Sequence, residues 1–148
     1  MSLGVSVRQR WVHIAQGMQQ DMAGYREMQS LMQAQFHAAL RHDSVAMQDV
    51  AERIAAQAQL LEQSRQQRVT HVQALLPAGT RVSMTAAFAL LQDPLRRQLA
   101  ALWQQLEVAV QQCKALNVRN CQLIMEQAQI MRHVLGDTAV DEGIYGPR

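Results

Sequence analysis

The sequence has few of the residues from which β-sheets are built. Phenylalanine, tyrosine and tryptophan occur only twice each, against 23 glutamines, nine methionines and many alanines. Gln, Ala, Met, Leu and Arg favour helices, whereas aromatic and β-branched residues favour strands. With only seven glycines and three prolines, little is present to interrupt a helix. The composition predicts an all-α protein, and 148 residues suit one domain with a shared core.

Long apolar runs and clustered charge are also missing. No run of about 18 apolar residues occurs, so we expect no direct membrane insertion. Residues 1–10 contain no apolar segment or cleavage site of the kind that a signal peptide needs. The net charge is only +2, and the basic residues are scattered, Arg96–Arg97 being the densest pair. Because a nucleic-acid-binding protein would carry a basic stripe on one face, we expect no nucleic-acid partner.

The two cysteines do not form a disulfide within one helix. Cys113 and Cys121 lie eight positions apart in a predicted helix, a rise of about 12 Å, whereas a disulfide needs Cα atoms within about 7 Å. Two free thiols suit a reducing compartment, and we therefore expect a cytoplasmic protein.

Spacings typical of catalytic or metal sites are absent. No glutamate in a predicted helix has a histidine three positions later, as di-metal bundles require, and no two histidines form an i, i+4 pair. Glycine-rich phosphate-binding motifs and Gly-x-Ser-x-Gly are missing too. We therefore expect no enzyme, no catalytic residue, no metal site and no cofactor.

Hydrophobic spacing predicts a first long helix over residues 5–40. Apolar side chains recur at steps of three or four along one stripe: Val7, Trp11, Ile14, Met18, Met22, Tyr25, Met28, Met32, Phe36 and Ala39. Gly17 and Gly24 interrupt the pattern, and we interpret them as close-packing positions rather than breaks. The methionines of the stripe could line an adaptable binding groove, but we favour the interpretation that they fill the core.

A second long helix is predicted over residues 44–76. Asp43 or Ser44 can cap it, and we favour a tight turn before it over a kink. Its seam becomes polar at Arg65 and Arg68. Pro77 and Gly79 end it, and a short helix over residues 83–91 then buries Phe88, Leu90 and Leu91.

The clearest predicted helix covers residues 94–135, about 63 Å at 1.5 Å per residue. We expect Asp93 as its N-cap, Pro94 in its first turn and Gly136 just past its end. Its seam follows a 4-3 spacing: Leu95, Leu99, Leu102, Leu106, Ala109, Cys113, Leu116, Asn120, Leu123, Gln127, Ile130 and Val134. Asn120 and Gln127 either fix the register of the packing or mark where the seam leaves the core.

Helices of this length must bury their stripes against one another. The predicted fold is an antiparallel bundle or extended coiled coil of three long helices with a short connecting helix. It comprises residues 1–136, and we expect residues 137–148 to form a mobile tail.

Several motifs together resemble one protein family. Trp103 is followed by Leu116-Asn117-x-x-Asn120, by a heptad-like stretch ending at Leu135, and by Tyr145-Gly146. The second helix adds the segment 61–66, Leu-Glu-Gln-x-Arg-Gln. In this order and spacing they resemble the FlgN-type flagellar export chaperones, although Cys121 stands where that family commonly has glycine.

The resemblance implies a chaperone that keeps hook–filament junction proteins unassembled by binding their disordered C-terminal segments. Its implied further partners are a membrane protein of the type III export gate and the export ATPase complex. Tyr145 matches the tail tyrosine that engages the gate, although an aromatic residue there could also fold back onto the bundle. The residues that match the client-binding region are Leu123, Ile124, Ile130, Met131, Val134 and Leu135.

Two other functions fit an all-α chain of this kind. In one, the protein is a structural coiled coil, and the apolar surface of its third long helix is buried in a homo-oligomer. It could equally be an adaptor protein without an export role. For the chaperone itself we expect a monomer or a weak homo-oligomer. A helical regulator that binds nucleic acid would need the basic stripe that is lacking.

Overall fold

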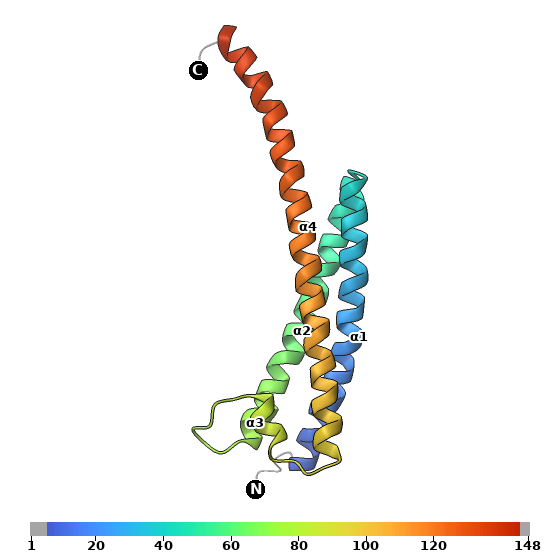
Figure 1. Ribbon diagram of the computed structural model, residues 1–148, viewed down its shortest axis with the longest axis vertical. Coiled ribbons are helices and arrows are strands. Elements are labelled where there is room, and N and C mark those ends of the chain that lie inside the picture. Colours follow the sequence, from blue (N-terminus) through green and yellow to red (C-terminus); the bar gives the residue numbers. More distant parts are fainter. Residues whose placement is uncertain (1–5, 146–148) are drawn as a thin grey trace.

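Over the residues that the structure describes, the fold consists of three long helices and one short one. The computed structural model describes residues 6–145, with side chains described for residues 6–136. Helix α1 spans Val7–Leu40, α2 spans Ser44–Leu75, α3 spans Met84–Phe88 and α4 spans Leu95–Tyr145. The hairpin of α1 and α2 packs against the first part of α4, which then continues well past the α1–α2 turn (Figure 1). The predicted all-α fold is confirmed.

Side-chain caps fix the starts of the first three helices. Ser6 and Gln9 form a reciprocal capping box before α1, with bonds of 3.0 and 3.1 Å to each other's backbone N–H. Asp43 accepts a bond from the Ala46 N–H before α2, and Ser83 accepts one from the Ala86 N–H before α3. His42 has φ = 54°, so the connection between α1 and α2 is a tight turn, as predicted, and not a kink.

Two predicted boundaries differ from the structure at the short connection. Helix α3 ends at Phe88 and not at residue 91, and Leu90, which was expected to be buried, is exposed. Helix α4 begins at Leu95, after a cis Asp93–Pro94 peptide bond. The Asp93 carboxylate lies 3.3 Å from the Arg96 guanidinium and 3.7 Å from that of Arg97, so it pairs with side chains of the first turn.

The predicted stop at Gly136 is wrong, because α4 continues to Tyr145. A glycine ends a helix when it adopts a left-handed conformation, and the φ of Gly136 lies outside that region. Glycine inside a helix costs only about 1 kcal/mol relative to alanine, which neighbouring helix-forming residues can offset. The backbone of residues 137–145, expected to be a tail, is therefore helical, while residues 146–148 lie outside the described residues.

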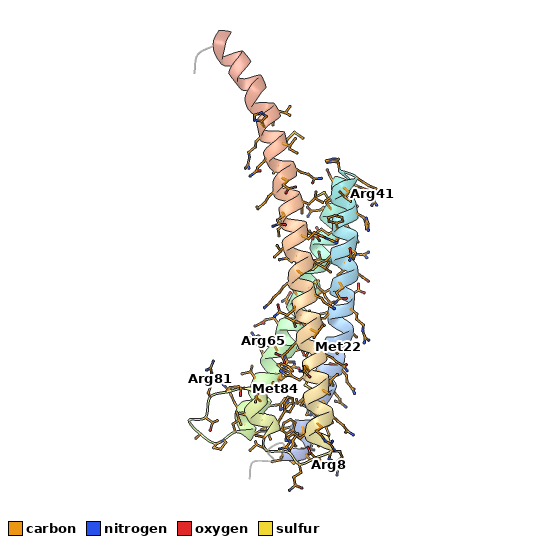
Figure 2. The ribbon with its side chains drawn as sticks, viewed as in Figure 1. Arg8, Met22, Arg41, Arg65, Arg81 and Met84 are labelled. Carbon is orange, nitrogen blue, oxygen red and sulfur yellow. The ribbon has the colours of Figure 1, made fainter. Side chains whose placement is uncertain are left out.

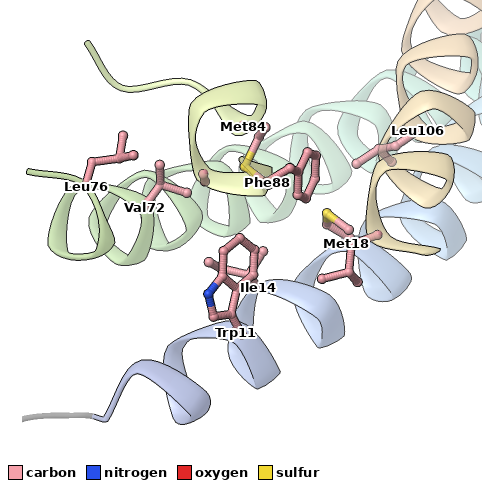
Figure 3. Close-up of a cluster of buried hydrophobic side chains, with 10 residues drawn as sticks. Trp11, Ile14, Met18, Val72, Leu76, Met84, Phe88 and Leu106 are labelled. Carbon is pink, nitrogen blue, oxygen red and sulfur yellow. The ribbon is translucent and has the colours of Figure 1, made fainter. Parts of the chain in front are cut away.

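The main core lies at the end of the bundle where α3 sits. Met84 and Phe88 of α3 cover Trp11, Ile14 and Met18 of α1, beside residues of α2 and α4 (Figure 3). The rings of Trp11 and Phe88 stack with centroids 6.1 Å apart. A smaller cluster further along joins Met28 and Met32 to Cys113, which confirms that these methionines of α1 belong to the core. No helix among the described residues is both long and apolar enough to cross a bilayer.

Helix α1 is the centre of the bundle. It packs against both α2 and α4, whereas no Cα atom of α2 lies within 8 Å of one in α4 over the described residues. Closely packed helices have axes 8–10 Å apart, so their nearest backbones approach more closely than this. The side of the bundle between α2 and α4 is therefore open, except where α3 contacts both of these helices.

Candidate functional site

Helix α4 presents large apolar side chains beyond the end of the hairpin. The exposed fractions are 65% for Ile130, 60% for Met131, 55% for Val134 and 59% for Leu135. Side chains radiate from this part of α4 past the level of Arg41, where no other helix lies beside it (Figure 2). We call residues 123–136 the α4 extension. Its exposed apolar surface is of the kind that marks sites of protein interaction.

The six predicted site residues occupy two adjacent stripes of the extension. Leu123, Ile130 and Val134 continue the stripe by which Leu106, Leu116 and Asn120 face α1. Ile124, Met131 and Leu135 continue a second stripe, which contains Val110, Lys114 and Asn117. Leu123 and Ile124 are half-buried and the other four are exposed. The structure thus places all six on one helix segment, and neither stripe is covered once α1 has ended.

Two polar side chains fix the point at which α4 leaves the bundle. The Asn120 amide, only 1% exposed, donates to the Met32 carbonyl at 2.7 Å and to Gln35 Oε1 at 2.8 Å. Two turns later, Gln127 Nε2 donates to the Ala39 carbonyl at 2.8 Å. Both therefore lie in the seam and bond to α1. Of the two interpretations of these residues, Asn120 fits the register device, whereas Gln127 lies within the α4 extension and bonds to the last turn of α1.

The remaining residues of the family motif lie along α4. Trp103 is half-buried beneath the Arg68 guanidinium, whose carbon lies 5.2 Å from the ring centroid. Leu116 packs on the small core cluster, and Asn117 is exposed. The backbone of Tyr145 ends α4, but its side chain lies outside the described residues, so the predicted gate contact stays a prediction.

An open groove runs between α2 and α4 over the small core cluster. It encloses about 440 Å³, and its floor is formed by Tyr25, Met28 and Met32 of α1. The walls are contributed by α2 and α4: Ile54, Ala58, Leu61, Glu62, Arg65, Arg68, Val110, Cys113, Lys114 and Asn117. This groove was not predicted from the sequence, because hydrophobic periodicity shows which face of a helix is apolar but not how far apart two helices stand.

A buried ion pair crosses from α1 to α2 near the closed end of this groove. Arg68 Nη1 lies 2.7 Å from Asp21 Oδ2, and the two side chains are only 12% and 4% exposed. Asp21 was not singled out in the sequence. The sequence does contain a signal for this pair. Arg68 interrupts the apolar seam of α2, and a buried arginine needs an acidic partner, for which α1 contains only Asp21 and Glu27. Burial raises the pKa of the nearby Tyr25 hydroxyl, and the negative charge of Asp21 raises it further.

A histidine pair lies on the other side of the α1–α2 hairpin. The rings of His13 and His71 stack with centroids 5.2 Å apart, and Arg10 Nη1 lies 3.2 Å from His71 Nδ1. Burial lowers the pKa of His71, and the neighbouring His13 and Arg10 lower it further. The pair is thus a pH-sensitive contact between the two helices of the hairpin.

The two thiols differ in their exposure to solvent. Both Cys113 and Cys121 are free, the first buried and the second exposed. Burial raises the pKa of the Cys113 thiol, so thiol reagents should modify Cys121 first.

The fold and the site together define a class of protein: an all-α bundle with an exposed apolar helix extension and an open groove between two of its helices. The family model described as FlgN protein matches residues 13–146, from the second turn of α1 to beyond the end of α4. The chain therefore belongs to the FlgN family of flagellar export chaperones, as its motifs predicted. Neither the curated proteins nor the solved structures contain a match to it.

Proposed function

We propose that this protein is a cytoplasmic export chaperone that binds the disordered C-terminal segments of hook–filament junction proteins. By covering these segments it prevents premature assembly, and it delivers its clients to the type III export gate. Chaperone function in flagellar export follows from the family. The identity of the client, the binding surface and the delivery step are the parts that we propose.

The observation that carries the proposal is the exposed apolar surface of the α4 extension. Ile130, Met131 and Leu135 are each more than half exposed on a helix that stands clear of the bundle. A disordered segment that folds into an amphipathic helix can cover these side chains, and each large apolar side chain contributes about 1.5–3 kcal/mol when fully buried. The ordering of the client offsets part of this gain, which keeps the complex releasable.

Delivery to the gate is assigned to Tyr145 through its match to the family's tail tyrosine. Its position at the end of α4 separates it from the α1–α2 turn and the core. Because Tyr145 lies beyond the six client-binding residues, substitution of Tyr145 by alanine should preserve client binding while reducing export of the junction proteins. Export is measured by the amount of client in the culture medium.

The test of client binding uses the double variant Ile130→Asp, Met131→Asp. Both side chains are exposed, so the variant should keep the helical content and unfolding midpoint of the wild type. We expect the loss of most of its affinity for a synthetic C-terminal peptide of a junction protein, measured by isothermal titration calorimetry. A matched control is Gln129→Asp, which adds a charge at an exposed polar position of the same turn. Unchanged affinity of a folded double variant would refute the proposed surface.

The same exposed surface would be buried in a structural coiled-coil homo-oligomer. Light scattering across a range of protein concentrations separates the two functions. The chaperone should bind the peptide as a monomer or as an oligomer that the peptide dissociates. An oligomer that hides the extension and does not bind the peptide would identify the structural alternative.

A further inference from the structure

The gap between α2 and α4 is filled by a helix at only one of its ends. There α3 contacts both flanking helices and buries Met84, Ala87 and Phe88. These residues have the spacing i, i+3, i+4 of an amphipathic helix. The chain itself therefore shows what kind of element fits between α2 and α4: a helix that turns an apolar stripe toward α1.

Beyond α3 the same gap is empty and forms the groove described above. The guanidinium of Arg68, over the ring of Trp103, lies between the α3 site and the groove. From there the groove has the apolar floor of Tyr25, Met28 and Met32. A second amphipathic helix placed here would complete a four-helix arrangement along α1.

The groove is continuous with the α4 extension. One stripe of α4 contains the groove residues Val110, Lys114 and Asn117 and continues, at steps of three or four, through Cys121, Ile124, Ala128, Met131 and Leu135. From Val110 to Leu135 this stripe is about 38 Å long at 1.5 Å per residue. One straight helix can therefore contact the groove and the extension together.

The extension alone offers barely enough apolar surface for a standard interface. A fully buried large apolar side chain removes roughly 60–120 Å² from water, if 1.5–3 kcal/mol is converted at 25 cal/mol per Å². Six such side chains give at most about 360–720 Å² of apolar surface, whereas a standard interface of roughly 800 Å² per partner is about 56–58% apolar, or roughly 450 Å². Four of the six side chains are only 55–65% exposed and the other two are half-buried, so the area that they still offer is smaller than this range. The groove adds further apolar surface.

We propose that the client's C-terminal segment binds as a single amphipathic helix of about 25 residues, which fills the α2–α4 groove and continues along the α4 extension. This inference rests on the proposed chaperone function and adds the second half of the binding site. The occupant buries apolar residues at a spacing like that of α3 against Met28 and Met32. Lys114 has no ion-pair partner among the described residues, whereas Arg65 and Arg68 on the opposite wall are paired. An acidic residue on the α4-facing flank of the client helix therefore complements this wall.

The groove can be blocked without removing a core contact. Ala58 lines the groove and is exposed, so Ala58→Arg places a long charged side chain in it. Ala56 is exposed about 160° away around α2. Ala56→Arg is therefore the matched control with the same change of charge and helix propensity. Circular dichroism establishes that both variants fold.

Binding is measured by calorimetry with the synthetic C-terminal peptide of a junction protein. We expect Ala58→Arg to weaken binding at least tenfold and Ala56→Arg to change it less than twofold. Lys114 is the chain's only lysine, so a photoreactive diazirine can be attached there by reductive alkylation, which keeps the positive charge of the amine. It should crosslink to the peptide, and the Lys114→Arg variant, treated in the same way, controls for labelling of the terminal amine.

The outcomes separate this inference from the proposed function. If Ala58→Arg binds like the wild type while Ile130→Asp, Met131→Asp does not, the client uses the extension alone and the groove proposal is wrong. If the wild type does not bind the peptide, the proposed function fails. If the wild type binds it and neither set of substitutions weakens binding, the client binds elsewhere, and both the extension and the groove are wrong as its binding site. If the wild type is a dimer, and the Ala58→Arg variant is a monomer with unchanged affinity for the peptide, a second copy of the chain occupies the groove. This outcome also overturns the proposal.

Discussion

The buried pair of Asp21 and Arg68 allows a quantitative test of how the hairpin is held together. The substitution Arg68→Met keeps an unbranched apolar stem but removes the guanidinium and its charge. The Asp21 carboxylate would then remain in the interface without its ionic partner. Asp21 Oδ2 and Arg68 Nη1 are 2.7 Å apart, and the two side chains are only 4% and 12% exposed, so solvent has little access to the carboxylate.

The expected cost follows from this burial. Removal of one partner of a buried ion pair typically destabilises a protein by about 3–5 kcal/mol. Loss of the contact with the Trp103 ring adds about 0.5–2 kcal/mol. Because domains of this size are typically stable by about 5–15 kcal/mol, Arg68→Met should shift the urea unfolding midpoint strongly. The double variant Asp21→Leu, Arg68→Met should recover most of the loss, because it leaves no buried charge.

The measurement is equilibrium unfolding in urea, followed by circular dichroism and tryptophan fluorescence. The matched control is Arg65→Met, because Arg65 also pairs with a carboxylate on α2, at 2.6 Å from Glu62, but both side chains are about half exposed. An ion pair that is exposed to water contributes little to the free energy of unfolding even when its atoms are close together, so this control should unfold near the wild-type midpoint. If both arginine variants are destabilised equally, or the double variant is no more stable than Arg68→Met, burial does not determine the energy of the pair.

Three further predictions concern single positions. Gly17→Ala should stabilise the protein by about 0.5–1 kcal/mol, because alanine favours the helix and its Cβ would lie at an ordinary contact distance of 3.8 Å from Ser64 Oγ. Gly24→Ala should not give this gain, because its Cβ would lie only 2.9 Å from the Leu61 side chain. Unfolding in urea compares the two variants with the wild type. Asn120→Ala should cost about 1–3 kcal/mol in the same assay, because it removes buried hydrogen bonds to α1. The pKa of His71 is lowered in the folded protein, so its contribution to stability is present above the usual value of 6.5 and is lost as the pH falls through the folded-state pKa. The unfolding temperature of the wild type should therefore fall between pH 7.5 and pH 5, and it should fall less in the His71→Gln variant. Equal losses in the two proteins would show that protonation of His71 does not cause the effect.

The parts of the fold that depend on short stretches of sequence were predictable. Asp43, one of the two residues expected to cap α2, does so because its side-chain oxygen reaches the Ala46 N–H three residues away, a contact that depends on the local sequence. The end of α4 was not predictable in this way. Whether Gly136 stops a helix depends on a small difference between the cost of glycine in a helix and the gain from the residues that follow it.

The candidate site could be predicted in part. The periodicity of α4 places Ile130 and Leu135 on apolar stripes, which is a property of the sequence. The groove and the Asp21–Arg68 pair depend on how far apart α2 and α4 stand and on how α1 and α2 are aligned. Residues 47 positions apart meet only after the hairpin has formed, so no local pattern identifies them. Gly24 is an intermediate case: close packing was predicted, and Leu61 is the residue that requires it.

The register of α4 determines how much of its apolar surface stays exposed. A 4-3 hydrophobic repeat would allow α4 to shift along α1 by one heptad, about 10.5 Å, with one leucine replacing another. Such a shift toward the hairpin would bring Ile130 against α1 and shorten the extension. The backbone acceptors alone do not prevent this shift, because Cys113, Asn120 and Gln127 bond the carbonyls of Tyr25, Met32 and Ala39, which also recur every seven residues. The side-chain acceptor of Asn120 does oppose it: the residue seven positions before Gln35 is Met28, so a shifted Asn120 amide would be buried without the bond that it now donates to Gln35 Oε1. The bond between Asn120 and Gln35 therefore favours the register in which the apolar surface that we propose for client binding stays exposed.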